Sequence, residues 1–161
     1  MPHTSAVVRI YTDGSCHTGL RIGAWVAILL LEGEKLILKG TAEHTTNNQM
    51  EIVAVIQAIH HIKDLSLDFA RIEIYTDSQY VMGIPGRASK FKSNDFHTRR
   101  GTDIQNSQLV QTLLKLLEVY PVTFIKVASH QKRTDVHDYN READMIARAA
   151  VRLYIKNSAQ E

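Results

Sequence analysis

The hydrophobic and polar residues at the start of the chain follow the period of a β-strand. In residues 7–13 successive side chains alternate between two faces, and the run ends at Asp13. Residues 25–31 are almost continuously apolar, which is typical of a strand buried on both faces. A turn at residues 32–35 leads into a third strand at 36–40. These three strands are predicted to form an antiparallel meander.

The pattern changes to a helical period after residue 46. The sequence Thr46-Asn47-Asn48-Gln49 matches the capping box, with Thr46 as the N-cap. Behind it, apolar residues recur at helical spacing; they are Met50, Val53, Ile56, Ile59 and Ile62. We expect Glu51 in the first turn and off this apolar stripe, where the helix dipole favours a carboxylate.

The remainder of the chain alternates strands and helices. A strand at 71–77 is predicted to run parallel to the first, because a helix connects the two. A short helix is predicted at 78–83, a helix at 109–119, a strand at 122–127 and a last helix from 140 to about 155. The apolar side of this last helix is predicted to consist of Ile146, Ala150, Leu153 and Tyr154.

Residues 14–23 and 128–138 are predicted to be loops, and residues 84–106 a long loop or protrusion, because these segments are polar or rich in turn-forming residues. The order of elements is three strands, helix, strand, helix, strand, helix. This order predicts an α/β fold, in which a mixed sheet carries helices on its faces.

Length and composition narrow the class of protein. A chain of 161 residues with 44% hydrophobic and 22% charged residues fits one globular domain. The single cysteine, Cys16, excludes an internal disulfide and a cysteine-based zinc site. The longest apolar run, residues 24–31, is too short to cross a membrane, and no apolar secretory segment precedes Asp13. We therefore expect a cytoplasmic protein, and a monomer, since no feature of the sequence requires a dimer.

The tetrapeptide Ile-Tyr-Thr-Asp occurs twice, and its copies end at Asp13 and Asp77. If the two strands are adjacent and parallel, the carboxylates emerge at one edge of the sheet, with strands about 4.8 Å apart. Carboxylates this close resist joint ionisation, and a divalent cation between them removes the repulsion. With the aspartates in register, Arg9 faces Glu73 across the strands and Tyr11 faces its counterpart. The alternative is that Asp is simply common where strands meet turns.

Two further carboxylates and a histidine extend this candidate site. Glu51 begins one helix, Asp144 lies early in the last helix, and His130 lies in the loop before it. Carboxylate oxygens suit hard cations such as Mg²⁺ or Mn²⁺ rather than zinc. The sequence therefore predicts a metal centre built from oxygen ligands.

Four motifs, in order and at suitable spacing, resemble the signature motifs of type 1 ribonuclease H. They are Thr12-Asp13-Gly14-Ser15, Thr46-Asn47-Asn48-Gln49-Met50-Glu51, Thr76-Asp77-Ser78-Gln79-Tyr80-Val81 and Asn140-Arg141-Glu142-Ala143-Asp144. The resemblance extends from about residue 7 to 151. It implies the ribonuclease H-like fold, a five-stranded mixed sheet with its second strand antiparallel and helices on both faces. It also implies a single catalytic domain over 1–161, with a core at about 7–155.

The resemblance implies an endoribonuclease that hydrolyses the RNA strand of RNA/DNA hybrids. Two Mg²⁺ ions, with Mn²⁺ as the other candidate, would serve catalysis and leave 5′-phosphate and 3′-hydroxyl ends. By position, the metal ligands are Asp13, Glu51, Asp77 and Asp144. His130 matches the loop histidine that assists proton transfer or product release, and His137 in the same loop stays an alternative.

The resemblance also implies residues that contact the hybrid duplex. Asn47, Asn48 and Gln79 match positions that touch its minor groove, where 2′-hydroxyls distinguish RNA from DNA. Thr46 and Asn106 match positions that hold a DNA phosphate, and for Thr46 this role competes with helix capping. The turn that follows Asp13, with Gly14, Ser15 and Cys16, is expected to reach a 2′-hydroxyl through its backbone.

Two segments depart from the family pattern. Residues 16–23 lack the Asn and Pro of the family's glycine-rich turn, so its asparagine contact to RNA has no equivalent residue. Residues 84–106 are basic, with interleaved aromatic residues but no tryptophan, and are predicted to grip the duplex differently. The alternatives are a nuclease of the same superfamily that cuts DNA, a catalytically inactive hybrid-binding module, and a domain excised from a reverse transcriptase. A chain that begins at Met1 fits a stand-alone enzyme better.

Overall fold

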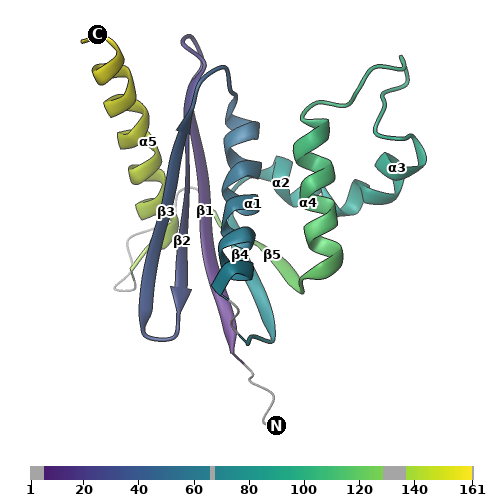
Figure 1. The fold of residues 1–161 in the computed structure, drawn as a ribbon, viewed down its shortest axis with the longest axis horizontal. Coiled ribbons are helices and arrows are strands. Elements are labelled where there is room, and N and C mark those ends of the chain that lie inside the picture. The colour runs from purple at the N-terminus through teal and green to yellow at the C-terminus, as the bar shows by residue number, and fades with distance from the viewer. Residues whose placement is uncertain (1–5, 66–67, 129–136, 161) are drawn as a thin grey trace.

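The computed structural model describes residues 6–65, 68–128 and 137–160. It contains a five-stranded sheet in the order β3-β2-β1-β4-β5 (Figure 1). The strands are β1 (Val7–His17), β2 (Ile22–Leu31), β3 (Glu34–Ala42), β4 (Arg71–Thr76) and β5 (Val122–Lys126). β2 runs antiparallel to β1 and β3, whereas β4 and β5 run parallel to β1. This arrangement confirms the predicted α/β fold and its antiparallel second strand.

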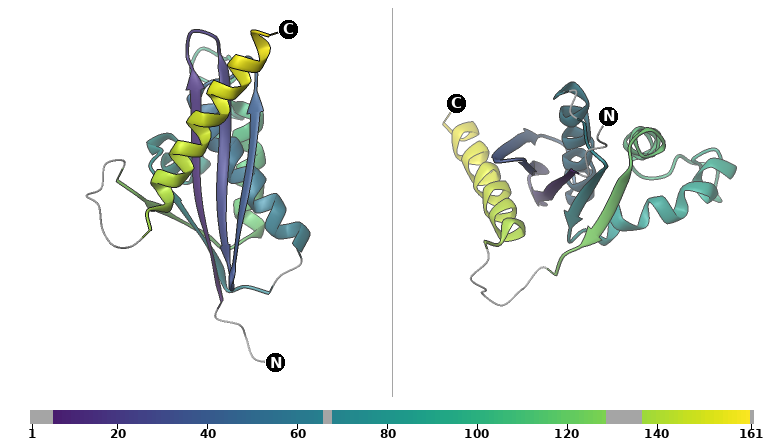
Figure 2. Two further views of the ribbon diagram at one scale, coloured as in Figure 1. Left: turned by 90° about the vertical axis from the view of Figure 1, so that its left-hand side faces the viewer. Right: turned by 90° about the horizontal axis from the view of Figure 1, so that it is seen from below.

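Helices cover both faces of the sheet. They are α1 (Asn47–Leu65), α2 (Gln79–Gly83), the 3₁₀ turn η1 (Pro85–Arg87), α3 (Ala88–Ser93), α4 (Ser107–Val119) and α5 (Tyr139–Ser158). Figure 2 shows α1 and α4 on one side of the sheet and α5 alone on the other. Within residues 6–65, 68–128 and 137–160, none of the helices has the length and apolarity that a membrane crossing requires.

The strand β2 is buried on both of its faces, as its continuous apolar run predicts. Val26, Ala27, Ile28 and Leu29 have no exposed surface. Ala27 and Leu29 belong to the large core under α1 and α4, while Val26 and Ile28 belong to a smaller core under α5. A strand between two helical layers has no polar face, and this explains the absence of alternation.

The apolar side predicted for α5 is right in part: Ile146 packs against the smaller core, but the most buried apolar residues lie elsewhere on the helix. The residues that face the sheet are Ala143, Ala147 and Val151, spaced four apart, whereas Leu153 is 59% exposed. Two alanines at the contact let the helix backbone lie close to β2, so the larger apolar residues flank the contact instead of filling it. The prediction was based on large apolar side chains, whereas a close contact between helix and sheet requires small ones.

The loop predicted at residues 14–23 is largely strand. β1 continues past Asp13, and Ser15, Cys16 and His17 pair with residues 24, 23 and 22 of β2. The connecting turn is confined to residues 18–21. The glycine at 23 permits a close approach, since a Cβ there would lie 2.6 Å from Cγ2 of Thr45. This glycine serves packing between segments and not a loop.

The register predicted between β1 and β4 is confirmed. Arg9 pairs with Glu73, and Nε of Arg9 lies 3.4 Å from Oε1 of Glu73. Tyr11 pairs with Tyr75, and their rings stack with centroids 4.5 Å apart. Asp13 and Asp77 therefore lie equally far beyond the last paired residues, at the same edge of the sheet.

The start of α1 matches the capping box in one of its two bonds. Oγ1 of Thr46 accepts a hydrogen bond of 3.1 Å from the backbone N–H of Gln49. The Gln49 side chain does not return to Thr46; its Oε1 accepts from Oγ1 of Thr45, at 2.9 Å. Glu51 is the fifth residue of the helix and is only 9% exposed, so its expected place in the first turn, off the buried face, is wrong.

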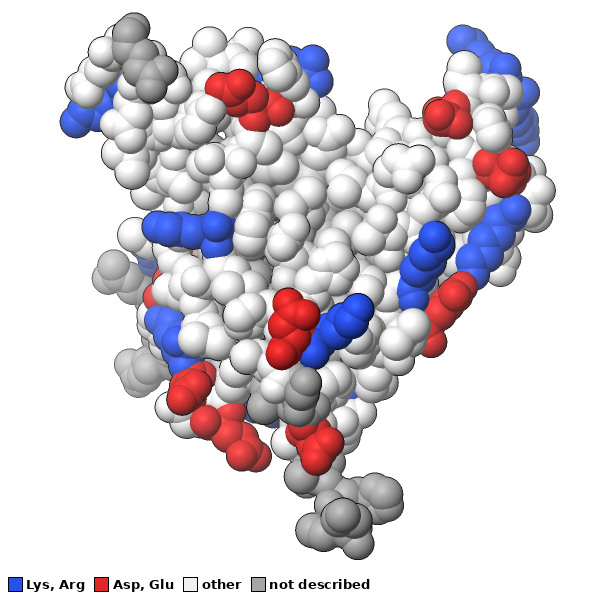
Figure 3. Space-filling view, in the orientation of Figure 1, with Lys and Arg blue, Asp and Glu red and all other residues white. Residues whose placement is uncertain are grey.

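Residues 84–106 form a protruding segment beside α4, not a plain loop (Figure 1). The segment contains η1, α3 and an isolated bridge between His97 and Asp103. Figure 3 shows Lys and Arg side chains along it, at the right of the view, with acidic side chains among them. Nζ of Lys92 lies 2.5 Å from Oε1 of Glu118 in α4. This ion pair neutralises part of the positive charge of the protruding segment.

The close packing of α5 predicts a position-specific effect on stability. Ala147→Leu would insert a branched side chain into the contact with β2 and should lower the free energy of unfolding by about 1–3 kcal/mol. Ala149→Leu, on the exposed side of the same helix, should change it by less than about 0.5 kcal/mol. Urea unfolding followed by circular dichroism measures both, and equal effects would contradict the α5 contact.

Candidate active site

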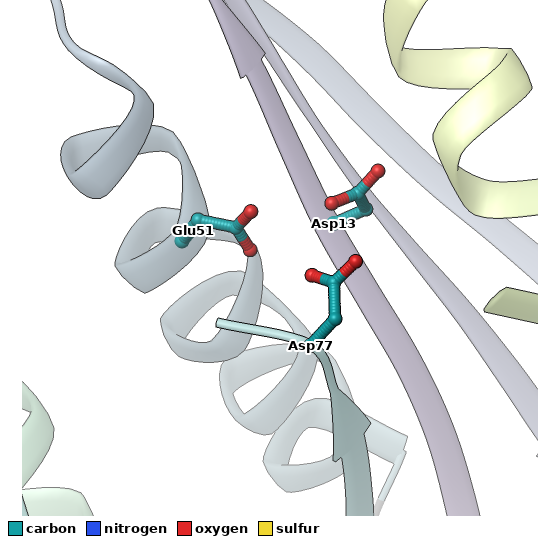
Figure 4. Close-up of side chains that lie close together, drawn as sticks. All are labelled: Asp13, Glu51 and Asp77. Atoms are coloured by element: carbon teal, nitrogen blue, oxygen red, sulfur yellow. The ribbon is translucent and has the colours of Figure 1, made fainter. Parts of the chain in front are cut away.

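Three carboxylates converge where the parallel strands end. Asp13 comes from β1, Glu51 from α1, and Asp77 directly follows β4. One oxygen from each lies within 4.8 Å of the others, and Figure 4 shows all three side chains directed toward one point. Asp13 is 4% exposed, and Asp77 is half-buried. The structure thus brings together three of the four predicted metal ligands.

The strand ends and one glycine position these groups. Pairing between β1 and β4 stops at Tyr11 and Tyr75, so the carboxylates that follow are beyond the ladder and open to α1. The second turn of α1 lies directly on β1, because a Cβ at Gly14 would be 2.6 Å from the backbone nitrogen of Glu51. Gly14 was predicted only as a substrate contact. In the structure its missing side chain lets Glu51 reach the strand ends.

Burial and neighbouring carboxylates raise the pKa values of all three acids. Burial, and then the charge of Asp77, raise the pKa of Asp13 to about 7. Burial, and then the charge of Asp13, raise the pKa of Glu51 to about 10. The pKa of Asp77 is also raised, chiefly by burial and further by the charge of Asp144. Like charges held in a poorly solvated space favour protonation unless a cation balances them.

The donor set fits a hard divalent cation. Oε2 of Glu51 is buried and has no hydrogen-bond partner among the described residues. A buried carboxylate oxygen without a donor is costly, and a cation satisfies it. All three groups offer oxygen atoms, which Mg²⁺ and Mn²⁺ prefer. The site can therefore hold the divalent ion that the sequence predicts.

Asp144 lies next to this cluster but is not part of it. Its negative charge raises the pKa of both Asp13 and Asp77, so it faces the other carboxylates. Its Oδ1 accepts a hydrogen bond of 3.0 Å from Nε of Arg148, one turn further along α5. The side chain of Asp144 is 40% exposed. This fourth predicted ligand is at the open side of the centre.

Of the two candidate histidines, His130 lies outside the described residues. Nε2 of His137 lies 3.1 Å from Oε2 of Glu142, and its ring packs edge-on against Tyr139. Both partners belong to the first turn of α5. His137 is therefore engaged by the helix that carries Asp144.

Two polar grooves meet beside the carboxylates. The first has a volume of about 660 Å³ and is lined by Cys16, Thr18, Arg21, Thr45, Thr46, Asn47, Asn48, Gln49, Gln105 and Asn106. The second, about 440 Å³, is lined by Gly14, Ser15, Cys16, His17, Asn47, Asp144, Arg148, Val151 and Arg152. Cys16 and Asn47 line both grooves, so the two are continuous.

Most of the predicted substrate contacts line these grooves. Gly14, Ser15, Cys16, Thr46, Asn47, Asn48 and Asn106 all do so. Gln79 lines neither; it is exposed at the first residue of α2, shortly after Asp77. Segments from the β1–β2 hairpin, the start of α1, the segment before α4 and the helix α5 are brought together here.

The geometry of Thr46 removes the expected competition between its two roles. In the cap its hydroxyl oxygen accepts from Gln49, which leaves the hydroxyl hydrogen available for donation to a ligand. Asn106 precedes α4 with a left-handed backbone, φ 58°, and its Nδ2 donates to the hydroxyl of Tyr80 at 3.0 Å. Tyr80 therefore orients a groove residue, a role that the sequence analysis missed.

The sequence analysis also missed the arginines of both grooves. Arg148 lies four residues after Asp144, a spacing that predicts a helical ion pair and could have identified it. Arg21 lies in a segment predicted as a loop, and no pattern in the sequence places it beside α1.

Comparisons with known proteins identify the family and agree with this fold. Residues 5–152 match the family model described as RNase H. The chain is 36% identical over 147 residues to a ribonuclease H of Caldicellulosiruptor saccharolyticus, covering 90% of this chain and 96% of the relative. It is 37% identical over 158 residues to a ribonuclease H of Bartonella tribocorum, covering 98% and 97%.

A solved structure shows the same fold at lower identity. It is the crystal structure of LC9-RNase H1, a type 1 RNase H with the type 2 active-site motif. The TM-score is 0.74 at 23% identity, over 92% of this chain and 73% of the other.

The fold and the site define an α/β protein with a carboxylate centre suited to a divalent cation, and with two grooves lined by residues of the same elements. The chain belongs to the ribonuclease H family. Its activity is that of this family, metal-dependent hydrolysis directed at RNA/DNA hybrids.

The raised pKa values predict how stability depends on pH in the absence of metal. The pKa values of Asp13 and Glu51 are higher in the folded state than their ordinary values of 3.8 and 4.5. The folded protein therefore binds more protons than the unfolded protein above about pH 4. Stability in EDTA should therefore fall as pH rises from about 5 to 8. Asp13→Asn should flatten this dependence and raise the free energy of unfolding at pH 8 by about 1 kcal/mol or more.

Urea unfolding at several pH values tests this, and Asp64→Asn, an exposed position near the end of α1, is the matched control. Added Mg²⁺ should stabilise the wild type but not Asp13→Asn. If Asp13→Asn and Asp64→Asn behave alike in EDTA, the three carboxylates do not repel one another as described.

Proposed function

We propose that this chain hydrolyses the RNA strand of RNA/DNA hybrids with two divalent ions and leaves 5′-phosphate and 3′-hydroxyl ends. The observation that carries the proposal is the convergence of Asp13, Glu51 and Asp77, with one oxygen of each within 4.8 Å of the others. Residues near them in the chain, Gly14 and Gln49 among them, line two grooves. In an RNA/DNA hybrid the RNA strand is cut and the DNA strand is only bound. The two grooves could each bind one of these strands.

The carboxylates hold the ions, with Mg²⁺ as the expected metal and Mn²⁺ as the other candidate. Asp13, Glu51 and Asp77 form the closed part of the centre, and Asp144 completes it from α5. Bound divalent ions supply an activated water and stabilise the leaving 3′-oxygen. The chain keeps the ligand oxygens in place through the β1–β4 register and the contact of α1 at Gly14.

The position of Asp144 assigns the strands to the grooves. We assign the RNA strand to the groove lined by Asp144 and the turn after Asp13, because Asp144 is the predicted metal ligand that lines a groove. The groove with Thr46 and Asn106 lies beyond Asn47 and takes the DNA strand. Asn47 and Cys16, common to both, face the minor groove between the strands, where the 2′-hydroxyl distinguishes RNA from DNA.

Asp77→Asn should keep the fold but abolish hydrolysis, because it preserves size and removes a negative ligand. We expect the rate to fall by about a thousandfold or more, a loss of roughly 4 kcal/mol of transition-state stabilisation. The assay uses a labelled hybrid with and without Mg²⁺, and end-group analysis identifies the RNA products. Double-stranded RNA and double-stranded DNA are included as substrates.

Unchanged folding with near-normal hybrid cleavage by Asp77→Asn would contradict the metal assignment. Cleavage of double-stranded DNA at the hybrid's rate would favour a DNA nuclease of the same superfamily instead. Binding without cleavage by the wild type would indicate an inactive hybrid-binding module.

We propose His130 as the histidine that assists turnover, because His137 is engaged by Glu142 and Tyr139 at the start of α5. His130→Ala should lower the turnover rate by about 10- to 100-fold, less than the loss in Asp77→Asn, since a proton-transfer group contributes less than a metal ligand. His137→Ala is the matched control. A larger loss in His137→Ala would reverse the assignment.

A further inference from the structure

The first groove contains one positive side chain in an otherwise neutral lining. Arg21, from the turn between β1 and β2, is the one charged residue among the described residues that line it. The others are hydroxyl, amide and thiol side chains. Burial raises the pKa of the Cys16 thiol, and the charge of Arg21 acts in the opposite direction, which places the guanidinium near Cys16.

The backbone at Arg21 is in a conformation that arginine seldom adopts. Its φ is 56°, in the left-handed region where glycine is favoured. The surrounding bonds hold it there: Arg21 N–H donates to the carbonyl of His17 at 2.7 Å, and its own carbonyl accepts from Thr45 N–H at 3.0 Å. The turn is thereby joined to the segment before α1. A non-glycine residue here costs of order 1 kcal/mol or more, and such strain gathers at functional sites.

The fold itself gains little from the guanidinium. Its hydrogen bond within the chain runs from Nη2 to the carbonyl of His44, at 3.5 Å, and the side chain is exposed. A long hydrogen bond to an exposed group contributes little to stability. Arginine offers five N–H donors in a planar fork that matches phosphate. A strained backbone that presents unused donors to a neutral groove is better explained by a ligand than by folding.

We propose that Arg21 binds a backbone phosphate of the uncleaved DNA strand and so positions the hybrid for cutting. This inference depends on the proposed function, because the strand assignment comes from the place of Asp144 in the other groove. Arg21 lines the same groove as Thr46 and Asn106. It gives this chain a cationic contact from the turn that lacks the Asn and Pro of the family pattern.

The test measures binding of a fluorescent hybrid by anisotropy in the Asp77→Asn background, together with steady-state cleavage by otherwise native protein. Arg21→Gln should weaken binding by roughly tenfold. It should also make the dependence of log K on log salt less steep, by the amount expected for the loss of about one phosphate contact. KM should rise by a similar factor, while kcat stays within about twofold, since the metal centre is untouched. Lys63→Gln, an exposed charge in the last turn of α1, is the control and should change none of these.

Arg21→Gly separates a binding role from a structural one. It removes the guanidinium and relieves the left-handed strain, so it should weaken binding like Arg21→Gln and yet raise the melting temperature. A lower melting temperature with unchanged affinity would show that Arg21 serves the fold, and would overturn the proposal.

The strand is tested with modified hybrids. When the DNA strand carries neutral methylphosphonate linkages, wild type and Arg21→Gln should bind equally. If the two proteins still differ in affinity, and the difference disappears only when the RNA strand carries the neutral linkages, the contact with the DNA strand is wrong. A different result would contradict the proposed function. In that case the wild-type protein would bind the unmodified hybrid through Arg21 but would not cut it.

Discussion

The fold places three like charges in a space where water screens them poorly, and much of the structure around the site serves this constraint. Asp13, Glu51 and Asp77 approach within 4.8 Å because β1 and β4 end in register and α1 rests on Gly14. Their pKa values are raised as a result. Repulsion between the three carboxylates destabilises the folded protein when no metal is bound. A divalent cation relieves the same repulsion, so the loss of stability and the binding of metal have one cause.

The β1–β2 hairpin has two functions in this arrangement. Its strand residues carry the sheet past Asp13, so that Cys16 lines both grooves. Its turn holds Arg21 in a left-handed conformation beside the start of α1. The same short segment thus joins the carboxylate centre to the groove that we propose binds the duplex.

Local patterns were sufficient to predict the fold. Alternation and continuous apolar runs located the strands, Thr46 marked the start of α1, and the repeated Ile-Tyr-Thr-Asp predicted the parallel register that Arg9 and Glu73 show. The errors occurred where contacts between distant segments overrode local preference. Residues 14–17 are strand because β2 pairs with them. α5 contacts the sheet through alanines because a close approach suits small side chains.

The sequence by itself determined the order of elements and the pairing of the two aspartate-ending strands, because these follow from periodicity and from a repeated motif along one segment at a time. It identified the candidate carboxylates through the resemblance of its motifs to one family. Tertiary structure alone decided that Glu51 is buried against Gly14, that Asp144 stands at the open side of the centre, and that Arg21 lines one groove with Thr46 and Asn106. Each of these depends on segments far apart in the chain, and the distance between them is set by packing and not by local preference.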